Sequence, residues 1–527
     1  MNKVLVSDSL SAEGLEILKK EQGLEVDVKT GLKPEELKAI IGQYHGLVIR
    51  SATKVTAEII EAAENLKVIG RAGIGVDNVD VPAATKKGIV VMNTPGGNTT
   101  TTAEHALSLL MSMVRFVPQA TASMKEGVWE KKKYQGREIT GKTLGVVGLG
   151  AIGSIVADRA LGLKMKVIAY DPFITPERAK KLGVEQVDLE ELYRRSDLIT
   201  IHVPKLPETT NLINAETLGK MKKGVYIVCA ARGGIVNEAD LLAALTSGQV
   251  AGAALDVFEK EPPGVTDLIK HPNLICTPHL GASTDEAQAA VALQVAEQIG
   301  DFLCRGIIVN AINVPSVAQE ELERMKPYIE LAESLGKLEG QLRIEGIKGI
   351  EIELSGGAAE GRPALITASA LAGLLKGMLG DWVNLVNAPL TARERGIVVK
   401  ETISGESEDY ASLIRLKISS QKGGMSVAGA IFGKREPRIV EIDQIGVEAI
   451  PKGNLLILRN YDKPGLVGSI GTTLGENGIN IGQLQFGRDK PGGHSITVIN
   501  VDSSPDEVIL KKLADLPNVI NVTKVIL

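Results

Sequence analysis

Three segments carry side chains that together could interconvert an alcohol and a carbonyl. Arg232 lies in "CAARGGIVNE", the carboxylates Asp256, Glu259 and Glu261 lie in "LDVFEKEPP", and His279 lies in "CTPHLGAST". A histidine can take up or release the hydroxyl proton near neutral pH. A guanidinium can bind a carboxylate and polarise a carbonyl, and a carboxylate beside an imidazole stabilises its protonated form. The residue types alone also fit a structural explanation, in which Arg232 forms a salt bridge in a turn and His279 is a satisfied loop histidine.

A glycine-rich segment supplies the second part of this chemistry, a binding site for a dinucleotide. The stretch "GLGAIG" (148–153) fits G-x-G-x-x-G, follows the apolar run "TLGVV" and opens a helical pattern. In that context the glycines allow a tight turn, the approach of a pyrophosphate and close packing of the helix. Asp171 ends the next apolar run, where a carboxylate binds the ribose hydroxyls of NAD and repels the 2′-phosphate of NADP. We therefore expect NAD, although an aspartate before Pro172 could also be an ordinary turn residue.

The elements that position these residues alternate between strands and helices over the first 300 residues. Short apolar runs are each followed by turn residues and a stretch of helical period, which is typical of parallel sheets covered on both faces. Ligands bind at the carboxyl ends of such strands, and Arg232, Asp256 and His279 each follow one. Two series of runs predict two doubly wound sheets, the first at 3–8, 46–55, 66–79 and 88–96, the second at 143–153, 165–171, 197–204, 224–234, 250–258 and 273–279.

The remainder of the chain predicts smaller units. A helical stretch at 283–304 opens with Ser283 as the expected N-cap and Glu286 three residues later, which fits a capping box. Beyond it, alternating stretches such as "GIEIELSG" and "LIRLKISS" predict an α+β domain. Residues 453–527 read as strand, helix, strand, strand, helix and strand, which predicts a ferredoxin-like unit.

Composition excludes several classes of protein. The 527 residues include 59 basic and 64 acidic ones, and a net charge of −5 indicates no nucleic-acid or anionic-membrane partner. No run approaches the roughly 18 apolar residues of a membrane span, and the N-terminus lacks the apolar region of a signal peptide. The three cysteines lack metal-ligand or disulfide spacing, so we expect reduced thiols, no metal and a cytoplasmic protein.

The motifs together resemble the D-2-hydroxyacid dehydrogenase family. "GLGAIG", Asp171, "ARGGIVNE", "DVFEKEPP" and "PHLGAST" match its order and spacing over about residues 1–312. By that resemblance, His279 is the acid/base, Glu261 is its carboxylate partner, and Arg232 binds and polarises the substrate. Glu259 is the rival carboxylate, but the family glutamate immediately precedes a proline, which selects Glu261.

Within that family, the chain is similar to the long D-3-phosphoglycerate dehydrogenases over its whole length. The segments that carry this similarity are "RSATKVTAEII", "GRAGIGVDNVD", "VMNTPGGNTTTTAEH" and "ATASMKEGVWEKKK". The resemblance implies oxidation of 3-phosphoglycerate in serine biosynthesis, a homotetramer, and L-serine as effector. The implied domains are a substrate-binding domain (1–97 plus 283–312), an NAD-binding Rossmann domain (98–282), an intervening domain (313–452) and an ACT domain (453–527).

The resemblance also implies the binding residues. For NAD these are Ile74, Gly148, Gly150, Ala151, Ile152, Gly153, Asp171, Val203, Ala230, Ala231, Arg232, Asp256, His279, Gly281 and Ala282. For the substrate they are Arg50, Ser51, Arg71, Gly73, Ile74, Gly75 and Asn98. For the effector they are Asn460, Asp462 and Asn480, whose other explanation is simple turn chemistry.

Two basic clusters and two other functions complete the hypotheses. Lys131, Lys132 and Lys133 form a basic run of the kind that is usually a solvated face, while the resemblance implies that one of the three reaches a substrate phosphate. Lys434, Arg435 and Arg438 could form an allosteric anion site, although a solvated charged face is the favoured interpretation. A hydroxypyruvate or glyoxylate reductase, and an NAD-sensing scaffold similar to the C-terminal-binding-protein corepressors, are the alternative functions. The expected ACT domain argues against both.

Overall fold

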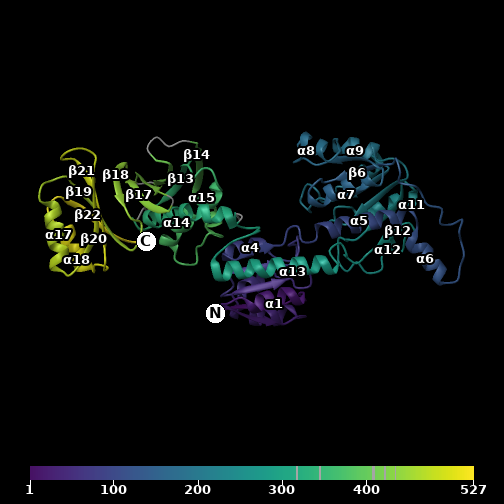
Figure 1. Cartoon of the computed structure of the whole chain (residues 1–527), viewed down its shortest axis with the longest axis horizontal. Helices are drawn as coiled ribbons and strands as arrows, with labels where there is room; N and C mark the ends of the chain where they lie inside the picture. The colour runs from purple at the N-terminus through teal and green to yellow at the C-terminus, as the bar shows by residue number, and fades with distance from the viewer. Residues whose placement is uncertain (316–318, 343–345, 406–409, 421–422, 434) are drawn as a thin grey trace. The chain divides into compact units, whose positions relative to one another are not determined.

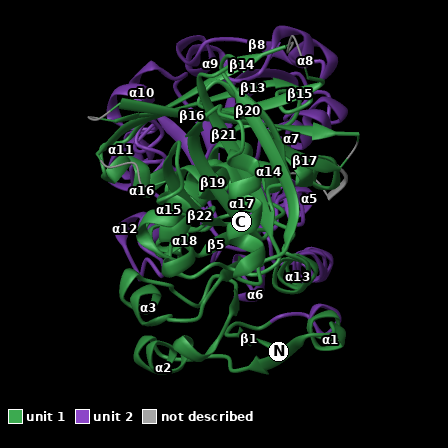
Figure 2. Cartoon of the chain, turned by 90° about the vertical axis from the view of Figure 1, so that its left-hand side faces the viewer, with its two compact units in different colours: residues 1–9, 15–93, 295–527 green, residues 10–14, 94–294 purple. Residues whose placement is uncertain are grey.

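Figure 1 shows the computed structural model of the chain. It describes residues 1–315, 319–342, 346–405, 410–420, 423–433 and 435–527. The chain divides into two compact units, coloured separately in Figure 2. The first comprises residues 1–9, 15–93 and 295–527, and the second comprises residues 10–14 and 94–294.

The first sheet has five parallel strands in the order β2-β1-β3-β4-β5. Its strands are β1 (Asn2–Val6), β2 (Leu24–Val28), β3 (Gly46–Ile49), β4 (Val68–Arg71) and β5 (Val90–Asn93). The intervening helices are α1 (Ala12–Lys20), α2 (Pro34–Ile40), η1 (Ile41–Gln43), α3 (Ala57–Ala62) and α4 (Val81–Lys87). Local signals set their ends: Asp80 accepts a hydrogen bond from Ala83 N at the start of α4, and Gly88 ends it with a φ of 78°.

The second sheet has seven parallel strands in the order β12-β11-β10-β9-β6-β7-β8. They are β6 (Thr143–Val147), β7 (Lys166–Tyr170), β8 (Glu185–Gln186), β9 (Leu198–Ile201), β10 (Val225–Cys229), β11 (Val250–Leu255) and β12 (Leu274–Cys276). The helices are α5 (Thr99–Val114), α6 (Val117–Lys125), α7 (Ala151–Gly162), α8 (Pro176–Lys181), α9 (Leu189–Arg195), α10 (Ala215–Lys220), α11 (Glu238–Ser247) and α12 (Asp267–Lys270). Two clusters of buried side chains share its strands, which is why those strands are almost wholly apolar.

The third sheet is mixed, with the order β14-β13-β15-β16-β17-β18. Its strands are β13 (Ile347–Gly356), β14 (Val398–Ser404), β15 (Ser412–Ser420), β16 (Gly423–Phe432), β17 (Glu436–Ile442) and β18 (Ile445–Ala449). The preceding and intervening helices are α13 (Asp285–Gly300), the short π-helix η2 (Asp301–Arg305), α14 (Gln319–Gln341), α15 (Pro363–Leu379) and α16 (Ala388–Glu394). Glycines let α14 and α15 pack backbone to backbone, because a Cβ on Gly336 would lie 2.1 Å from Ala370 O.

The fourth sheet is antiparallel, with the order β20-β21-β19-β22. Its elements are β19 (Asn454–Tyr461), α17 (Leu466–Glu476), β20 (Ile481–Arg488), β21 (His494–Val501), α18 (Glu507–Ala514) and β22 (Val519–Ile526). Leu456 and Leu458 of β19 pack against α17 and α18, which Figure 1 shows beside this sheet. Leu455 and Ile457, on the other face, join the core of the third sheet.

The expected fold class is confirmed: two doubly wound parallel sheets, an α+β unit and a ferredoxin-like unit. The sequence interpretation missed β2 and β8, which are polar edge strands. The expected N-cap at Ser283 is wrong by one residue, because Thr284 Oγ1 accepts the bond from Ala287 N at 3.2 Å. Among the described residues, we found no helix that is both long and apolar enough to cross a membrane.

Candidate active site

The carboxyl ends of the central strands of the second sheet are aligned in register. Cys229 of β10 pairs with Leu255 of β11, and Leu255 pairs with Cys276 of β12. Arg232, Glu261 and His279 follow these three strands. All three residues therefore leave the sheet at the carboxyl ends of its strands, and we call this side the carboxyl edge. The glycine loop after β6 and Asp171 after β7 leave the same edge, because β6 pairs with both β7 and β9. The sheet thus gathers the expected cofactor and catalytic segments.

The glycine loop has three different reasons for its three glycines. Gly148 has a φ of +91°, and a Cβ there would lie 2.6 Å from His202 O. A Cβ on Gly153 would lie 2.0 Å from Gly148 O, so helix α7 packs against the loop only without a side chain. Gly150, the N-cap of α7, has nothing within 4 Å of an added Cβ. This open space over the helix N-terminus fits the approach of a pyrophosphate.

Asp171 supports the loop and keeps capacity for a ligand. Its Oδ2 accepts a hydrogen bond from Leu149 N at 2.8 Å, and its Oδ1 accepts one from Phe173 N at 2.8 Å. Each carboxylate oxygen can accept a second bond, so the half-exposed group can still bind ribose hydroxyls. The residues present therefore fit NAD.

His279 and Glu261 form a pair on the same edge. His279 Nδ1 lies 2.8 Å from Glu261 Oε2, and both side chains are part-exposed. The second carboxylate oxygen of Glu261 accepts a hydrogen bond from Phe258 N at 3.0 Å. Since a carboxylate only accepts, His279 Nδ1 carries the hydrogen and Nε2 is the nitrogen left for a substrate.

Asp256 organises the loop that carries His279. The carboxylate is fully buried and accepts hydrogen bonds from Leu280 N at 2.7 Å and Gly281 N at 2.8 Å. His279 N donates to the carbonyl oxygen of Asp256 at 2.9 Å, and His279 itself has a φ of +56°. The expected role of Asp256 in binding the cofactor stays a prediction; its side chain acts on the 277–281 loop.

Arg232 lies in a turn that packs against the Glu261 segment. A Cβ on Gly233 would lie 1.8 Å from Phe258 O, so the turn needs glycine there. Arg232 is half-buried, and its Nη1 donates to Ala231 O at 2.7 Å. The turn that carries Arg232 therefore packs against Phe258, whose N–H bonds to Glu261.

The other expected NAD residues lie on the same edge, with one exception. Ala151 and Ile152 open α7, Val203 follows β9, Ala230 and Ala231 follow β10, and Gly281 and Ala282 follow His279. Ile74 follows β4 of the first sheet and belongs to the other unit. In the basic run after α6, Lys133 pairs with Glu130 at 3.0 Å, while Lys131 and Lys132 are exposed.

The expected substrate residues of the first unit follow or end two neighbouring strands of the first sheet. Arg50 follows Ile49, which pairs with Arg71 in the neighbouring strand. Arg50 N donates to Asp8 Oδ2 at 2.6 Å, and Asn78 Nδ2 donates to Arg50 O at 2.6 Å. Ser51 is exposed beside Arg50. Two arginines at adjacent strand ends suit the expected binding of anionic groups, which stays a prediction.

A glycine turn supports Arg71. Gly73 has a φ of +138°, and a Cβ there would lie 1.7 Å from Arg71 Nη1, so only glycine leaves room for the guanidinium. Gly75 follows in the same turn, and Ile74 O accepts a hydrogen bond from Asn93 Nδ2 at 2.6 Å. Asn98 belongs to the other unit, where it precedes α5.

The expected effector residues separate in the structure. Asp462 lines a hollow of about 550 Å³ with Arg488, Phe486 and Gly465. Hydrogen bonds from Gly492 N and Arg488 hold the pKa of Asp462 below its ordinary value. Asn460 is fully buried and bonds internally to Ser495 and Thr497, so its side chain does not line this hollow.

Asn480 is also committed to a contact within the chain. It is exposed, and its Nδ2 donates to Asp502 Oδ2 at 2.7 Å. Asn460 and Asn480 therefore stay predictions as effector ligands, and Asp462 is the one that the geometry favours.

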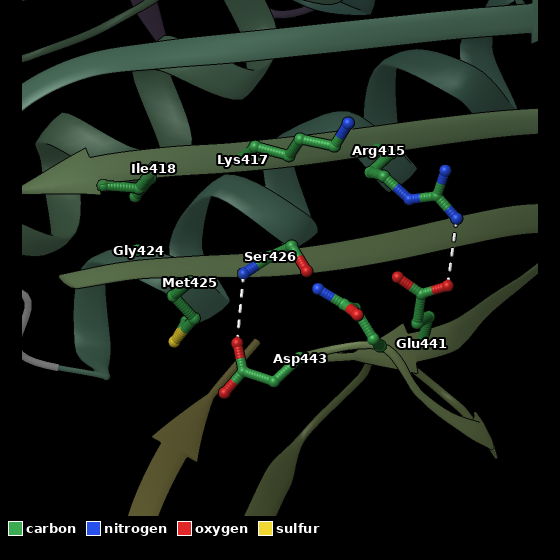
Figure 3. A pocket seen from close by; sticks show the side chains of 9 residues that line it. Arg415, Lys417, Ile418, Gly424, Met425, Ser426, Glu441 and Asp443 are labelled. Atoms are coloured by element: carbon green, nitrogen blue, oxygen red, sulfur yellow. Dashed lines mark hydrogen bonds and ion pairs between the residues drawn. The ribbon is translucent and has the colours of Figure 1, made fainter. Parts of the chain in front are cut away.

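A hollow of about 650 Å³ lies on the third sheet. Figure 3 shows the side chains that line it. Its charged groups are internally paired: Arg415 Nη2 lies 2.9 Å from Glu441 Oε2, and Asp443 accepts a bond from Ser426 N and pairs with Arg459. The expected anion site lies elsewhere. Arg438 pairs with Glu436 at 2.9 Å, Arg435 is exposed, and Lys434 lies outside the described residues.

The sequence interpretation missed two residues that contact Asp256, namely His105 and Thr277. His105 of α5 lies 3.2 Å from Asp256 Oδ1, and Thr277 Oγ1 donates to the same oxygen at 2.5 Å. The rarity of histidine, six in the chain, was the available signal for His105. Within the described parts of the chain, no group of three His, Cys, Asp or Glu residues could hold a metal ion.

Comparison with protein families matches three segments. Residues 107–281 match the NAD-binding domain of the D-isomer specific 2-hydroxyacid dehydrogenases. Residues 324–443 match the D-3-phosphoglycerate dehydrogenase intervening domain, and residues 454–518 match the ACT domain. The NAD cofactor expected from the glycine loop and Asp171 is thereby confirmed.

Individual relatives extend the similarity to the whole chain. The D-3-phosphoglycerate dehydrogenase of Archaeoglobus fulgidus is 46% identical over 99% of both chains, and that of Bacillus subtilis is 42% identical over 99% of both. The crystal structure of NAD-dependent formate dehydrogenase from Staphylococcus aureus in complex with NAD is 31% identical, with a TM-score of 0.54, and covers 60% of this chain and 100% of that one. With full-length similarity at this level, the chain belongs to the D-3-phosphoglycerate dehydrogenase family, within the NAD-dependent 2-hydroxyacid dehydrogenases.

Proposed function

We propose that the chain catalyses the NAD-dependent oxidation of 3-phospho-D-glycerate to 3-phosphohydroxypyruvate, the first step of the phosphorylated route to L-serine. The observation that carries the proposal is the His279–Glu261 pair, 2.8 Å apart on the sheet edge that also carries the glycine loop and Arg232. Full-length relatives named for this activity support the choice of substrate.

The residues divide the chemistry as follows. His279 Nε2 accepts the proton of the substrate C2 hydroxyl, and Glu261 stabilises the imidazolium through Nδ1–H. Arg232 binds the substrate carboxylate and polarises the carbonyl that forms. NAD, held by the glycine loop and Asp171, would supply the acceptor for the hydride that leaves C2. In the reverse direction His279 returns the proton to the carbonyl oxygen.

The glycine loop, Asp171 and the remaining expected residues on the second sheet hold the cofactor. Arg50, Ser51, Arg71 and the Gly73–Gly75 turn bind the anionic groups of the substrate, with Asn98. We also propose the four domains expected from the sequence, with boundaries at residues 97, 282, 312 and 452. The proposal also includes the assembly of four copies of the chain into a homotetramer.

L-Serine is the proposed effector of the ACT domain. The hollow beside Asp462 offers a carboxylate for an ammonium group and Arg488 for a carboxylate, which suits a free amino acid. This proposal rests on the hollow and on the ACT domain, and not on the named activity of the relatives.

The test is turnover of the full-length chain with NAD and 3-phospho-D-glycerate, followed by NADH absorbance with the keto product trapped. NADH formation that depends on 3-phospho-D-glycerate supports the proposal. Activity only with unphosphorylated 2-hydroxyacids would favour the hydroxypyruvate or glyoxylate reductase, and NAD binding without any turnover would favour the scaffold. Inhibition by L-serine that is lost in Asp462→Ala, with turnover retained, supports the effector site.

A further inference from the structure

His105 contacts two residues that hold the loop of the proposed acid/base, Asp256 and Thr277. It lies on α5, far in sequence from that loop, with Nε2 3.2 Å from Asp256 Oδ1 and 3.1 Å from Thr277 Oγ1. Thr277 directs its only hydroxyl hydrogen to Asp256 Oδ1, at 2.5 Å. Because the ionised carboxylate can only accept, the hydrogen of the His105–Asp256 contact must lie on His105 Nε2.

The carboxylate that receives this hydrogen bond holds the catalytic loop in place. Asp256 accepts bonds from Leu280 N and Gly281 N through its side chain, and from His279 N through its carbonyl oxygen. These bonds fix His279 in the left-handed region, with a φ of +56°, which a non-glycine residue adopts only when its surroundings enforce it. The orientation of the imidazole toward Glu261 therefore depends on Asp256.

We propose that His105 is a positioning residue for the dehydrogenase reaction: by donating Nε2–H to Asp256, it holds that carboxylate in the orientation in which the 277–281 loop presents His279 to the substrate. This inference rests on the proposed function of His279. His105 itself touches neither His279 nor Glu261 through any bond that we observe among the described residues.

The charge balance around Asp256 supports this role. Burial raises the pKa of Asp256, but hydrogen bonds from His105, Thr277 and Leu280 N outweigh it and hold the pKa below its ordinary value. Cys229 of β10 also interacts with the charge of Asp256; burial raises the pKa of that thiol to about 11, so it stays neutral near pH 7. His279 meets Asp256 through its backbone N–H. Loss of His105 therefore lets the pKa of Asp256 rise, and protonation then removes acceptors from the loop.

The surroundings of His105 make substitution practical. Its ring lines a hollow of about 470 Å³ together with Ser108, Leu109, Cys276 and Thr277, and its side chain is 18% exposed. A different side chain of similar length thus meets open space and not a crowded core. His105→Gln retains an N–H donor, and His105→Leu retains bulk without a donor. Ser108→Ala is the matched control, because Ser108 is exposed one turn away on α5 and its hydroxyl donates to Glu104 O on the same helix.

The experiment compares these three variants with the wild-type chain in kcat, in KM for NADH and in the pH profile of kcat for 3-phosphohydroxypyruvate reduction. We expect His105→Leu to lower kcat roughly tenfold or more, with KM for NADH and the melting temperature nearly unchanged. The acid-side loss of kcat should move to higher pH. His105→Gln should restore most of kcat and the wild-type profile, and Ser108→Ala should match the wild type.

Hydrogen exchange of the peptide that contains residues 277–281 gives a readout independent of turnover. Faster exchange in His105→Leu, reversed in His105→Gln, supports the positioning role even if the wild type prefers another 2-oxoacid. The positioning role would be overturned if His105→Leu had the pH profile of kcat and the hydrogen-exchange rate of the wild type. It would also be overturned if His105→Gln were as impaired as His105→Leu. An inactive wild type with the exchange pattern above would overturn the proposed function and leave the role of His105 in the loop standing.

Discussion

His279 Nδ1 lies 2.8 Å from Glu261 Oε2, although the two residues follow different strands and are 18 positions apart. The contact exists because β11 and β12 end in register, at Leu255 and Cys276. Glu261 is fixed in turn by Phe258 N, and His279 by the carbonyl oxygen of Asp256. The pair therefore leaves one imidazole nitrogen, Nε2, to act on a substrate.

Replacing His279 with Asn should remove the proton carrier while keeping a polar side chain of similar reach. We expect kcat to fall by roughly 10² or more, because general acid–base catalysis contributes about 10²–10⁴ in rate. NADH affinity, measured by fluorescence titration, should change little. Glu261→Gln should also lower kcat, since an amide cannot stabilise the imidazolium. Retention of wild-type kcat by His279→Asn would remove it as the acid/base.

The glycine loop allows a matched pair of alanine substitutions. Gly150→Ala should fold normally, because its φ of −68° suits alanine and an added Cβ meets nothing within 4 Å. It should nevertheless weaken NAD binding roughly tenfold or more, since the Cβ occupies the space above the helix N-terminus. Gly153→Ala should lower the free energy of unfolding by about 2 kcal/mol, because its Cβ would lie 2.0 Å from Gly148 O.

Calorimetry of both variants, with and without NAD, measures these effects. Normal NAD affinity in Gly150→Ala would contradict the assigned phosphate position. A melting temperature of Gly153→Ala equal to that of the wild type would contradict the described packing of α7.

Asp171→Ala should weaken NAD binding and narrow the preference for NAD over NADP. Removal of the carboxylate deletes acceptors for the ribose hydroxyls and the charge that repels a 2′-phosphate. We expect the ratio of kcat/KM values for NAD and NADP to fall roughly tenfold. Glu177→Ala, an exposed substitution on the nearby α8, is the control. If the ratio stays at its wild-type value, another group selects the cofactor.

Glu339 predicts an unusual dependence of stability on pH. The side chain is fully buried in α14, and neither carboxylate oxygen has a hydrogen-bond partner among the described residues. Burial, and then the charge of Asp443, raise the pKa of Glu339 well above its ordinary value. The folded chain therefore keeps a proton that the unfolded chain loses near pH 4, so this group's contribution to stability falls as pH rises above that value.

Glu339→Leu should accordingly raise the melting temperature, and by more at about pH 8 than at about pH 5. Glu323→Leu, an exposed substitution on the same helix, should show no such dependence. Thermal unfolding at both pH values measures the difference. An equal effect of Glu339→Leu at the two values would mean that Glu339 does not titrate in the folded chain over this range.

Much of this architecture follows from local sequence patterns. Buried parallel strands are apolar throughout, so β6, β7, β9, β10, β11 and β12 stand out from the helices between them. The edge strand β2, "LEVDV", alternates with charged residues because one side of it faces solvent, and it escaped prediction. The residues of the glycine loop, Asp171 and the His279 pair were found because each follows one of the apolar strands.

The interactions that depend on three-dimensional proximity could not be predicted. Nothing near "TAEH" in the sequence indicates that His105 of α5 contacts Asp256, 151 positions away. The fourth sheet was expected as a separate unit, yet Leu455 and Ile457 share a core with Leu335 of α14. Asn460 matched a ligand position, but its side chain is buried and bonded to Ser495 and Thr497 of the neighbouring strand β21, a strand pairing that the motif does not encode.

The most direct test of the account is the ratio of kcat/KM values for 3-phosphohydroxypyruvate and hydroxypyruvate, with NADH, in the wild type and in Arg50→Ala. We predict a large preference for the phosphorylated substrate in the wild type. Arg50→Ala should remove most of that preference and leave turnover of hydroxypyruvate nearly unchanged, because a guanidinium at the end of β3 can bind the phosphate. Equal kcat/KM values for the two substrates in the wild type would contradict the proposed substrate.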